Sequence, residues 1–216
     1  MNPIIEATER LIRAGRRLGA RGLISAGEGN LSIRLDADRL LVTPAGMRKD
    51  ELAPDDLVVV WLNDPERVAV SRSGRGPTSD LAIHIAVHTA RPDIGAMAHA
   101  HLPAAMGLTL AGEVPDPSAL PETAILLPRL PYLSLGIPGS AELAGRIAAA
   151  LAEPPEPLAS AVLLERHGAV AVGADPDQAV NRLELVEVLC RTWRDALLIR
   201  AASASLAIVE TPSPGS

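Results

Sequence analysis

Short aliphatic runs that follow one another with no room for a helix between them are the feature that most limits how this chain can fold. Residues 31–35 alternate as a strand does, and residues 40–42 form a second apolar run a few positions later. Residues 161–164 and 169–172 are another such pair, separated by a turn that contains His167. Parallel neighbours need a crossover connection of a dozen or more residues, whereas antiparallel neighbours do not. The sequence therefore predicts a sheet that is at least partly antiparallel.

Helical patterns surround these strands, because apolar residues recur at helical spacing and Pro, Ser and Asp mark helix starts. We expect two further strands at 57–62 and 96–101, and helices at about 4–20, 79–90, 103–110, 140–152 and 176–202. The proline-rich segment from Pro115 to Pro138 is expected to be irregular. No repeat or linker divides the chain, so we expect a single α/β domain over residues 1–210 and a flexible tail at 211–216.

The composition argues against several classes of function. The net charge is −6 at pH 7, whereas a nucleic-acid partner demands clustered Lys and Arg, so we expect no such partner. With no Phe, two Trp and one Tyr, the core must be aliphatic. No apolar run reaches the length of a membrane span, and the N-terminus lacks the layout of a signal peptide, so we expect a cytoplasmic protein with no membrane partner. Cys190 lies in an apolar helical stretch and is expected to be buried and inert.

Two of the five histidines stand one residue apart at the end of a predicted strand. Residues two apart on a strand point to the same face, so His99 and His101 aim their imidazoles at one point. With His167 they make the open, three-ligand site of a catalytic zinc or a similar divalent ion. His84 and His88 stand four apart on a predicted helix and lack the glutamate of a zinc-protease motif. We interpret that pair as packing or solvent-contact residues.

Three turns offer backbone amides and polar side chains that suit an anion. The first is Gly27-Glu28-Gly29-Asn30, which lacks the spacing of a dinucleotide-binding loop. The second is Thr43-Pro44-Ala45-Gly46. The third, Pro77-Thr78-Ser79, stands at a helix N-terminus, where the dipole and unpaired amides favour a phosphate. Asp80 follows directly and can act as a general base or a fourth metal ligand, although a helix-start charge is the simpler interpretation.

These motifs occur in an order that resembles the class II aldolase/adducin family. The resemblance rests on residues 25–32, 42–46, 77–80, 91–101 and 167–168, and it extends over about residues 5–200. It implies a three-layer α/β/α sandwich with a largely antiparallel central sheet, assembled as a homotetramer with active sites between subunits. It also implies that His99, His101 and His167 bind Zn²⁺ or another divalent metal ion.

The resemblance further implies a pocket for the phosphate of a small sugar phosphate. The residues implied are Gly27, Gly29, Asn30, Thr43, Gly46, Thr78 and Ser79. Turn amides, rather than arginine or lysine, would then meet the phosphate, in keeping with the acidic net charge. A ketose phosphate would chelate the zinc through its carbonyl and adjacent hydroxyl, and the zinc would stabilise an enediolate.

The chain departs from the family pattern at its acids. Family aldolases carry a glutamate where this chain has Asp80, which is one methylene shorter, whereas the epimerase branch has an aspartate there. The family also uses tyrosines to protonate a product, but the single tyrosine here is Tyr132. Glu122 stands at the position of the family's central tyrosine. We take Glu122 as the candidate acid, with a solvated loop glutamate as the alternative.

The reaction we expect is a zinc-dependent aldol cleavage of a small phosphorylated ketose to dihydroxyacetone phosphate and an aldehyde, with Asp80 as base and Glu122 as acid. Sugar-phosphate 4-epimerisation, decarboxylation and dehydration at the same zinc site are the alternatives. An alternative of another class is a non-catalytic, adducin-like assembly domain. Three converging imidazoles argue against it, because a domain that only assembles has no need of them.

Overall fold

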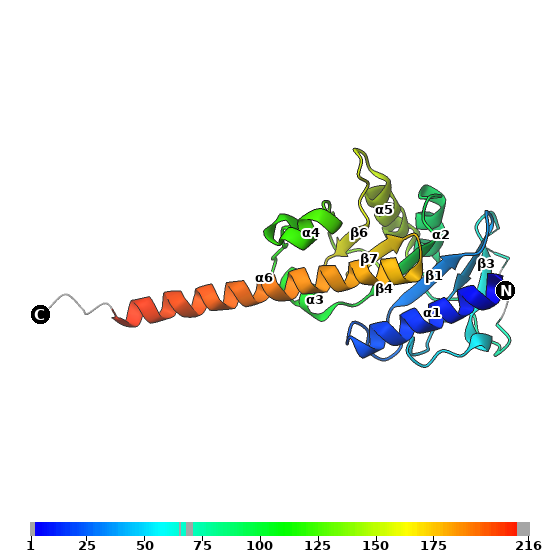
Figure 1. The fold of residues 1–216 in the computed structure, drawn as a ribbon, viewed down its shortest axis with the longest axis horizontal. Helices are drawn as coiled ribbons and strands as arrows, with labels where there is room; N and C mark the ends of the chain where they lie inside the picture. Colours follow the sequence, from blue (N-terminus) through cyan, green and yellow to red (C-terminus); the bar gives the residue numbers. More distant parts are fainter. Residues whose placement is uncertain (1–2, 65, 68–70, 211–216) are drawn as a thin grey trace, which may run out of the picture.

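The computed structural model describes residues 3–64, 66–67 and 71–210, so the tail expected at 211–216 lies outside the described residues. A seven-stranded sheet runs through the molecule (Figure 1). Its strands are β1 (Asn30–Arg34), β2 (Arg39–Val42), β3 (Val58–Trp61), β4 (Ala96–Ala100), β5 (Tyr132–Leu133), β6 (Ala161–Leu164) and β7 (Gly168–Gly173). They lie in the order β3-β2-β1-β4-β7-β6-β5, and every neighbouring pair is antiparallel except β5 and β6. The largely antiparallel sheet is therefore confirmed.

Helices cover both faces of this sheet. They are α1 (Pro3–Ala20), α2 (Leu81–Ala90), α3 (Pro103–Leu110), α4 (Pro121–Leu126), α5 (Ala141–Ala152) and α6 (Pro176–Glu210), with the short 3₁₀ helices η1 (Pro54–Asp56) and η2 (Pro117–Ala119). One apolar cluster joins α1, α3 and α6 to one face of the sheet, and separate clusters join α2 and α5 to the other. The three-layer α/β/α sandwich is confirmed.

Alternation along the central strands explains why there are separate cores. In β7, Ala169 and Ala171 belong to the cluster under α6, whereas Val170 and Val172 belong to the cluster under α2 and α5. Successive strand side chains face opposite sides, so each strand serves both layers. The two faces of β7 therefore differ in side-chain size. Alanines pack toward α6, and the larger valines pack toward α2 and α5.

The proline-rich segment from Pro115 to Pro138 is more ordered than the sequence predicted, because it contains η2, α4 and β5. Pro117 and Pro121 each occupy the first position of a helix, where a missing N–H costs nothing. The hydroxyl of Thr123 donates to the carbonyl oxygen of Pro117 at 2.6 Å and so ties α4 to η2. The expectation of an irregular segment was wrong because these prolines start helices instead of breaking them.

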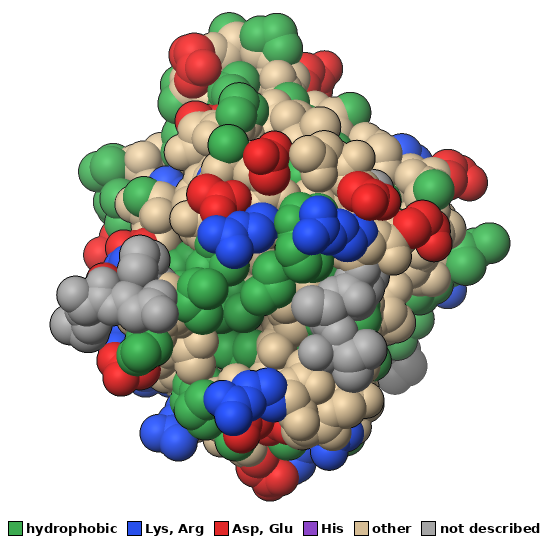
Figure 2. Space-filling model, turned by 90° about the vertical axis from the view of Figure 1, so that its right-hand side faces the viewer, with side chains coloured by type: hydrophobic (Ala, Val, Ile, Leu, Met, Phe, Trp, Pro, Cys, Tyr) green, Lys and Arg blue, Asp and Glu red, His purple; other side chains and the backbone are tan. Residues whose placement is uncertain are grey.

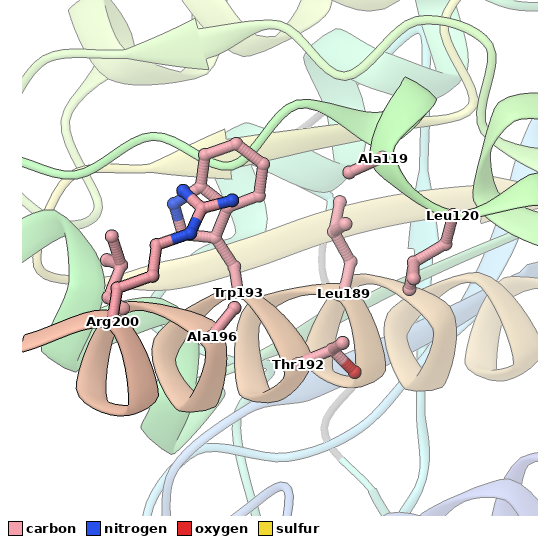
Figure 3. Close-up of a pocket in the computed structure, with 8 residues that line it drawn as sticks. Ala119, Leu120, Leu189, Thr192, Trp193, Ala196 and Arg200 are labelled. Carbon is pink, nitrogen blue, oxygen red and sulfur yellow. The ribbon is translucent and has the colours of Figure 1, made fainter. Parts of the chain in front are cut away.

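The last helix is longer than predicted, running to Glu210 instead of 202, and it projects far from the body of the molecule (Figure 1). Leu198 and Ile199 on the projecting part are exposed. Nearer the body, α6 and residues 119–120 line a cavity of about 210 Å³, with Trp193 and Arg200 in its wall (Figure 3). None of the described residues that line this cavity is a site residue expected from the sequence.

Charges of both signs lie close together on the face shown in Figure 2, around an apolar area, and they form no single basic patch there. Three ion pairs join α1 to α6 and to the residue just before it: Arg10 to Asp175 at 2.9 Å, Arg13 to Asp177 at 3.5 Å and Arg17 to Glu184 at 2.8 Å. Within the described part of the chain, no helix has both the length and the apolar character that crossing a membrane requires.

Candidate metal centre

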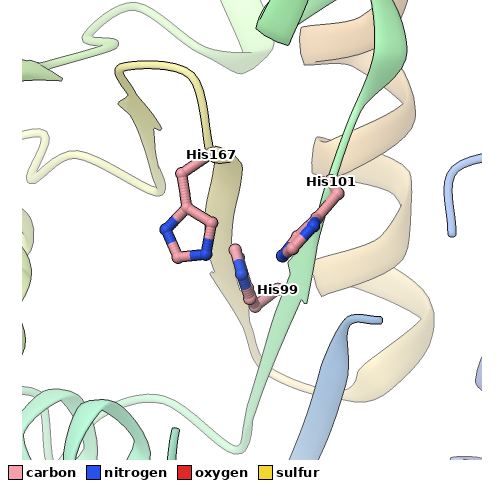
Figure 4. Close-up of side chains that lie close together, drawn as sticks. All are labelled: His99, His101 and His167. Atoms are coloured by element: carbon pink, nitrogen blue, oxygen red, sulfur yellow. The ribbon is translucent and has the colours of Figure 1, made fainter. Parts of the chain in front are cut away.

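The central strands bring three histidines together (Figure 4). His99 lies in β4 and His101 directly follows that strand, while His167 lies in the turn that leads into β7. The ring centroids are 4.8–5.0 Å apart, and one ligand nitrogen from each ring lies within 4.8 Å of the others. Gly168 makes this approach possible, because its φ is +101° and a Cβ there would collide with the carbonyl oxygen of Ala100.

The hydrogen bond of His99 fixes which of its nitrogens can bind a metal. Its Nδ1 lies 2.9 Å from the carbonyl oxygen of Ala169, which can only accept, so Nδ1 carries the proton. The lone pair therefore lies on Nε2, and this buried atom has no partner among the described residues. An orphaned buried nitrogen of this kind fits a metal ligand held in place by its second hydrogen bond.

Burial also sets the charge of the cluster. It lowers the pKa of His99 to about 3, with further lowering from His167 and His101 nearby. The pKa of His167 is lowered by burial and then by His101. The Nδ1 of His101 stands 3.7 Å from a carboxylate oxygen of Glu28. His99 and His167 are neutral near pH 7 and so are ready to coordinate a cation.

A cavity of about 170 Å³ opens beside these rings and contains most of the residues expected from the sequence. Those that line it are Gly27, Gly29, Asn30, Gly46, Thr78, Ser79, Asp80, His101 and His167. Glu28, Ala45, Lys49 and Pro138 complete the wall. The fold thus brings residues of all three predicted turns together with His101 and His167. Gly27 and His167 are 140 positions apart in the sequence but line the same cavity.

Three expected residues lie outside the wall of this cavity. His99 is fully buried behind it. Thr43 is also fully buried, and its hydroxyl accepts a hydrogen bond from the amide of Leu31 at 3.1 Å. Its carbonyl oxygen accepts from the amide of Thr78 at 3.0 Å, so Thr43 joins two of the turns instead of facing the cavity. Glu122 is exposed on the first turn of α4 and does not line the cavity of its own chain.

Asp80 stands at the N-cap of α2, but its carboxylate makes no capping hydrogen bond. Instead, Oδ2 accepts from the side-chain amide of Asn30 at 2.7 Å. The residue is 8% exposed and lines the cavity. Because the carboxylate does not cap the helix, it is available for chemistry at the cavity.

Lys49 is the residue that sequence reasoning missed. It is 1% exposed, it lies in the cavity wall, and its ammonium donates to the carbonyl oxygens of Gly27, at 2.8 Å, and of Met47. Burial lowers its pKa to about 8, and the nearby Asp80 opposes that shift. The sequence analysis expected turn amides, rather than lysine or arginine, to meet the phosphate, and the structure adds a lysine to the same wall. The available signal was a basic residue three positions after the Gly46 turn, and its burial depends on tertiary contacts.

The close fit of α1 explains how a lysine comes to be buried there. A Cβ on Gly15 would collide with the carbonyl oxygen of Lys49, so α1 lies directly against this turn. With no side chain at that point, the helix covers the turn and excludes water from the stem of Lys49.

Comparison with known proteins identifies a family that the sequence matches. The family model of the class II aldolase and adducin N-terminal domain matches residues 9–194. Methylthioribulose-1-phosphate dehydratase of Acidiphilium cryptum (strain JF-5) is 34% identical over 192 residues, covering 83% of this chain and 85% of the relative. The 5-methylthioribulose-1-phosphate/5-deoxyribulose-1-phosphate aldolase of Rhodospirillum rubrum is 32% identical over 188 residues, covering 85% and 79%.

A solved structure agrees with the fold. The L-fuculose-1-phosphate aldolase from Thermus thermophilus superposes with a TM-score of 0.77 at 26% identity, covering 96% of this chain and 98% of that one. The family match spans most of the sequence and includes the cavity and all three histidines. This chain therefore belongs to the class II aldolase and adducin N-terminal domain family.

Proposed function

We propose that this protein is a lyase that uses Zn²⁺ or another divalent ion and acts on a small ketose 1-phosphate, such as 5-methylthioribulose 1-phosphate. One observation carries the proposal: a single cavity joins two of the three clustered histidines, the three predicted turns, Asp80 and Lys49. Its volume, about 170 Å³, is below that of pockets for drug-sized ligands and suits a small compound. The names of the two relatives support the substrate class.

The three imidazoles are the groups that would hold the metal ion. His99 presents Nε2 because Ala169 occupies its Nδ1, and His101 and His167 present their rings at the cavity wall. A divalent ion at this place is a Lewis acid that stabilises negative charge on the carbonyl oxygen of the substrate.

The phosphate would find backbone amides and one cation in the same cavity. Gly29 and Gly46 have φ values of +69° and +65°, a conformation found in backbone nests that bind anions. The ammonium of Lys49 has three N–H donors and gives two of them to carbonyl oxygens, so one is left for a phosphate oxygen. Lys49 then supplies the positive charge that amides alone do not.

Asp80 is the base in this proposal. It removes the proton from C3 of the ketose, and the negative charge spreads onto the C2 carbonyl oxygen. The bond between C4 and its hydroxyl oxygen then breaks. The leaving hydroxide takes a proton and departs as water, which balances the proton removed from C3 and leaves a 2,3-diketone 1-phosphate after tautomerisation.

Aldol cleavage is the second candidate, favoured by the similarity to the R. rubrum aldolase. The base then takes the proton of the C4 hydroxyl and the C3–C4 bond breaks, which releases an aldehyde and leaves the electron pair on C3 and the C2 carbonyl oxygen. Return of one proton to C3 gives dihydroxyacetone phosphate and balances the proton removed. Both reactions place negative charge on the same carbonyl oxygen and differ in the bond broken at C4. We place dehydration first because the A. cryptum dehydratase matches at 34% identity over most of both chains.

Turnover of 5-methylthioribulose 1-phosphate by the metal-loaded protein tests the proposal and separates the two reactions. Dehydration gives a product lighter by one water in mass spectrometry, whereas cleavage releases dihydroxyacetone phosphate, which a coupled reductase assay detects. Asp80→Asn is expected to abolish either reaction while keeping the metal. No turnover of any ketose 1-phosphate by the metal-loaded protein would contradict the proposed function.

We further propose a homotetramer in which Glu122 acts as the acid in the cavity of a neighbouring copy. Glu122 lies on α4, which packs against α6, and the projecting part of α6 exposes Leu198 and Ile199. Exposed apolar side chains grouped in this way are typical of a surface that another chain covers. Light scattering should therefore give the mass of four chains. A fully active monomer would contradict both parts of this proposal.

A further inference from the structure

A continuous chain of hydrogen bonds runs from Asp80 into the interface between β1 and α2. Asn30 donates to Asp80 at 2.7 Å, and the amide oxygen of Asn30 lies 2.7 Å from Nε2 of His84. The other nitrogen of His84 lies 2.7 Å from the hydroxyl of Ser32. That hydroxyl lies 2.9 Å from Nε2 of His88. The chain therefore links Asp80 to His88 through three intervening side chains.

The spacing of a strand and of a helix explains how these side chains meet in turn. Asn30 and Ser32 are two apart on β1, so they share one face and lie about 6.6 Å apart along the strand. His84 and His88 are four apart on α2, so they share one face and lie about 6 Å apart along the helix. Because the two repeats nearly match, the four side chains interleave where α2 packs on the sheet.

The chemistry of the donors gives this chain a single direction. An ionised Asp80 only accepts, so the NH₂ group of Asn30 faces it and the amide oxygen faces His84. His84 must then carry its proton on Nε2 and accept at Nδ1 from the hydroxyl of Ser32. Ser32 has its proton committed, so it accepts from Nε2–H of His88. Every bond from His88 onward therefore donates toward Asp80.

A cation stands at the far end of the chain. The guanidinium of Arg34 donates to the carbonyl oxygen of His88 at 2.6 Å, and the same nitrogen lies 3.4 Å from Nδ1 of His88. Nδ1 is the acceptor that the direction of the chain requires, and an arginine can only donate to it. The series of hydrogen bonds thus begins at the positively charged Arg34, beside His88, and ends at Asp80, which lines the cavity.

Burial keeps the middle of the chain neutral. Asn30, Ser32, His84 and His88 are each no more than 3% exposed. Burial lowers the pKa of His84 to about 4, and burial, together with His84 and Arg34, lowers the pKa of His88 well below its ordinary value. Both rings are therefore neutral near pH 7, which the donor pattern requires.

We propose that His84, Ser32 and His88 are positioning residues for the base of the proposed lyase. They fix the amide of Asn30, and Asn30 in turn fixes one oxygen of Asp80 and leaves the other to take a proton. This inference rests on the proposed function, in which Asp80 is the base. Aspartate has a short reach, and a catalytic group displaced by about 1 Å loses on the order of 100-fold in rate, so a fixed carboxylate matters here.

The proton positions on the histidine rings test the proposed direction of the hydrogen bonds without any substrate. Long-range ¹H–¹⁵N NMR spectra of the full-length protein should show His84 and His88 neutral and protonated on Nε2 near pH 7, with His99 of the metal-free protein protonated on Nδ1. In Ser32→Ala, His84 should keep its Nε2 proton because Asn30 still accepts it, whereas His88 loses its acceptor. A proton on Nδ1 of His84 or His88 in the unmodified protein would overturn the inference.

Kinetics then test the effect on Asp80. Ser32 contacts neither the cavity nor the clustered histidines in the described hydrogen bonds, so Ser32→Ala should lower kcat by about 10-fold while KM and metal content stay unchanged. Ser71→Ala is the matched control. It also removes a buried, hydrogen-bonded hydroxyl, but Ser71 takes no part in the hydrogen bonds that link Asp80 to His88. A kcat in Ser32→Ala equal to that of Ser71→Ala overturns the positioning role. If no ketose 1-phosphate is turned over, the proposed function fails. The histidine tautomers still show in that case whether the hydrogen bonds from His88 to Asp80 are formed as described.

Discussion

The region directly behind the cavity and the interface between β1 and α2 both bury histidines, but the ring nitrogens are bonded differently in the two regions. His99, at the cavity, has one nitrogen bonded and one without a partner among the described residues. His84 and His88, at the interface, have both nitrogens within hydrogen-bond distance of a partner. Burial lowers the pKa of all three. Neither burial nor pKa therefore separates His99, the proposed metal ligand, from the two packed histidines, whereas unused hydrogen-bonding capacity does.

Lys49 belongs with His99 in this comparison. It is buried like the interface residues, but its ammonium has one N–H left after its two hydrogen bonds to carbonyl oxygens. Lys49 in the cavity wall and His99 directly behind it thus have unused hydrogen-bonding capacity, whereas the interface residues have used theirs. We expect changes at the wall to act on ligands, and changes at the interface to act on stability and on the placement of Asp80.

Among the changes that compare the two regions, loss of His99 is expected to have the largest effect. His99→Ala removes the fully buried ligand nitrogen, so the metal should be lost and kcat should fall by about 1,000-fold, because a bound metal ion supplies several kcal/mol. Elemental analysis of the purified protein, alongside kcat, measures both. His84→Phe is the matched control: it also removes a buried histidine but no ligand nitrogen, and it should keep its metal. Equal metal loss in the two variants would contradict the distinction between the two regions.

Loss of the lysine comes next in size. Lys49→Met removes a donor to the phosphate, and hydrogen bonds to charged groups contribute about 1.5–3 kcal/mol, so KM for a ketose 1-phosphate should rise by about 10-fold to 100-fold. The neighbouring Arg48 pairs with Asp50 and is half exposed, so Arg48→Met is the control and should leave KM unchanged. Lys49→Met should not raise KM for the same ketose without its phosphate. If KM for that ketose rises by the same factor, Lys49 does not act on the phosphate.

The sequence predicted the site at the cavity wall far better than the interface. The spacing of His99 and His101 sets their common face within one strand, and turn residues mark Gly27, Gly46 and Thr78 as places where amides are free. None of this needs knowledge of which elements meet. The clustering of the three histidines with most of the predicted turn residues depends on the strand order, and the sequence indicated it only through the resemblance to the class II aldolase/adducin family.

What the sequence did not predict depends on packing between elements. The pairing of His84 and His88 with Asn30 and Ser32 exists because α2 lies over β1, and helix periodicity alone does not say which strand a face will meet. The burial of Lys49 likewise depends on Gly15, which lets another helix lie against its backbone. Residues that act through tertiary contacts in this way leave no local pattern in a single sequence.

Acid should weaken the fold through the interface histidines. The unfolded chain protonates a histidine near its ordinary value of 6.5, whereas burial lowers the pKa of His84 to about 4 in the folded chain. Between these values the unfolded state binds more protons, so this stabilisation is complete above pH 6.5 and is lost as the pH falls toward 4, by about 3 kcal/mol for His84 alone. Urea unfolding with a chelator present, so that metal binding does not contribute, measures the slope. His84→Phe should have a shallower slope, and parallel slopes would show that this ring does not control the acid response.

The smallest effect we expect is the stability lost in His84→Phe near neutral pH. The phenyl ring fills a similar space, but the amide oxygen of Asn30 loses its donor and the hydroxyl of Ser32 loses its acceptor. A buried polar group left without a partner costs about 1–3 kcal/mol, and partial pairing elsewhere should limit the total loss of stability to about 2 kcal/mol. His99→Phe in metal-free protein is the informative contrast, because it also fills the space of the ring, Nε2 of His99 has no partner to lose and only Ala169 loses a donor. If the chelator-treated His99→Phe protein is destabilised as much as His84→Phe by urea unfolding, unused hydrogen-bonding capacity is not what distinguishes the two regions.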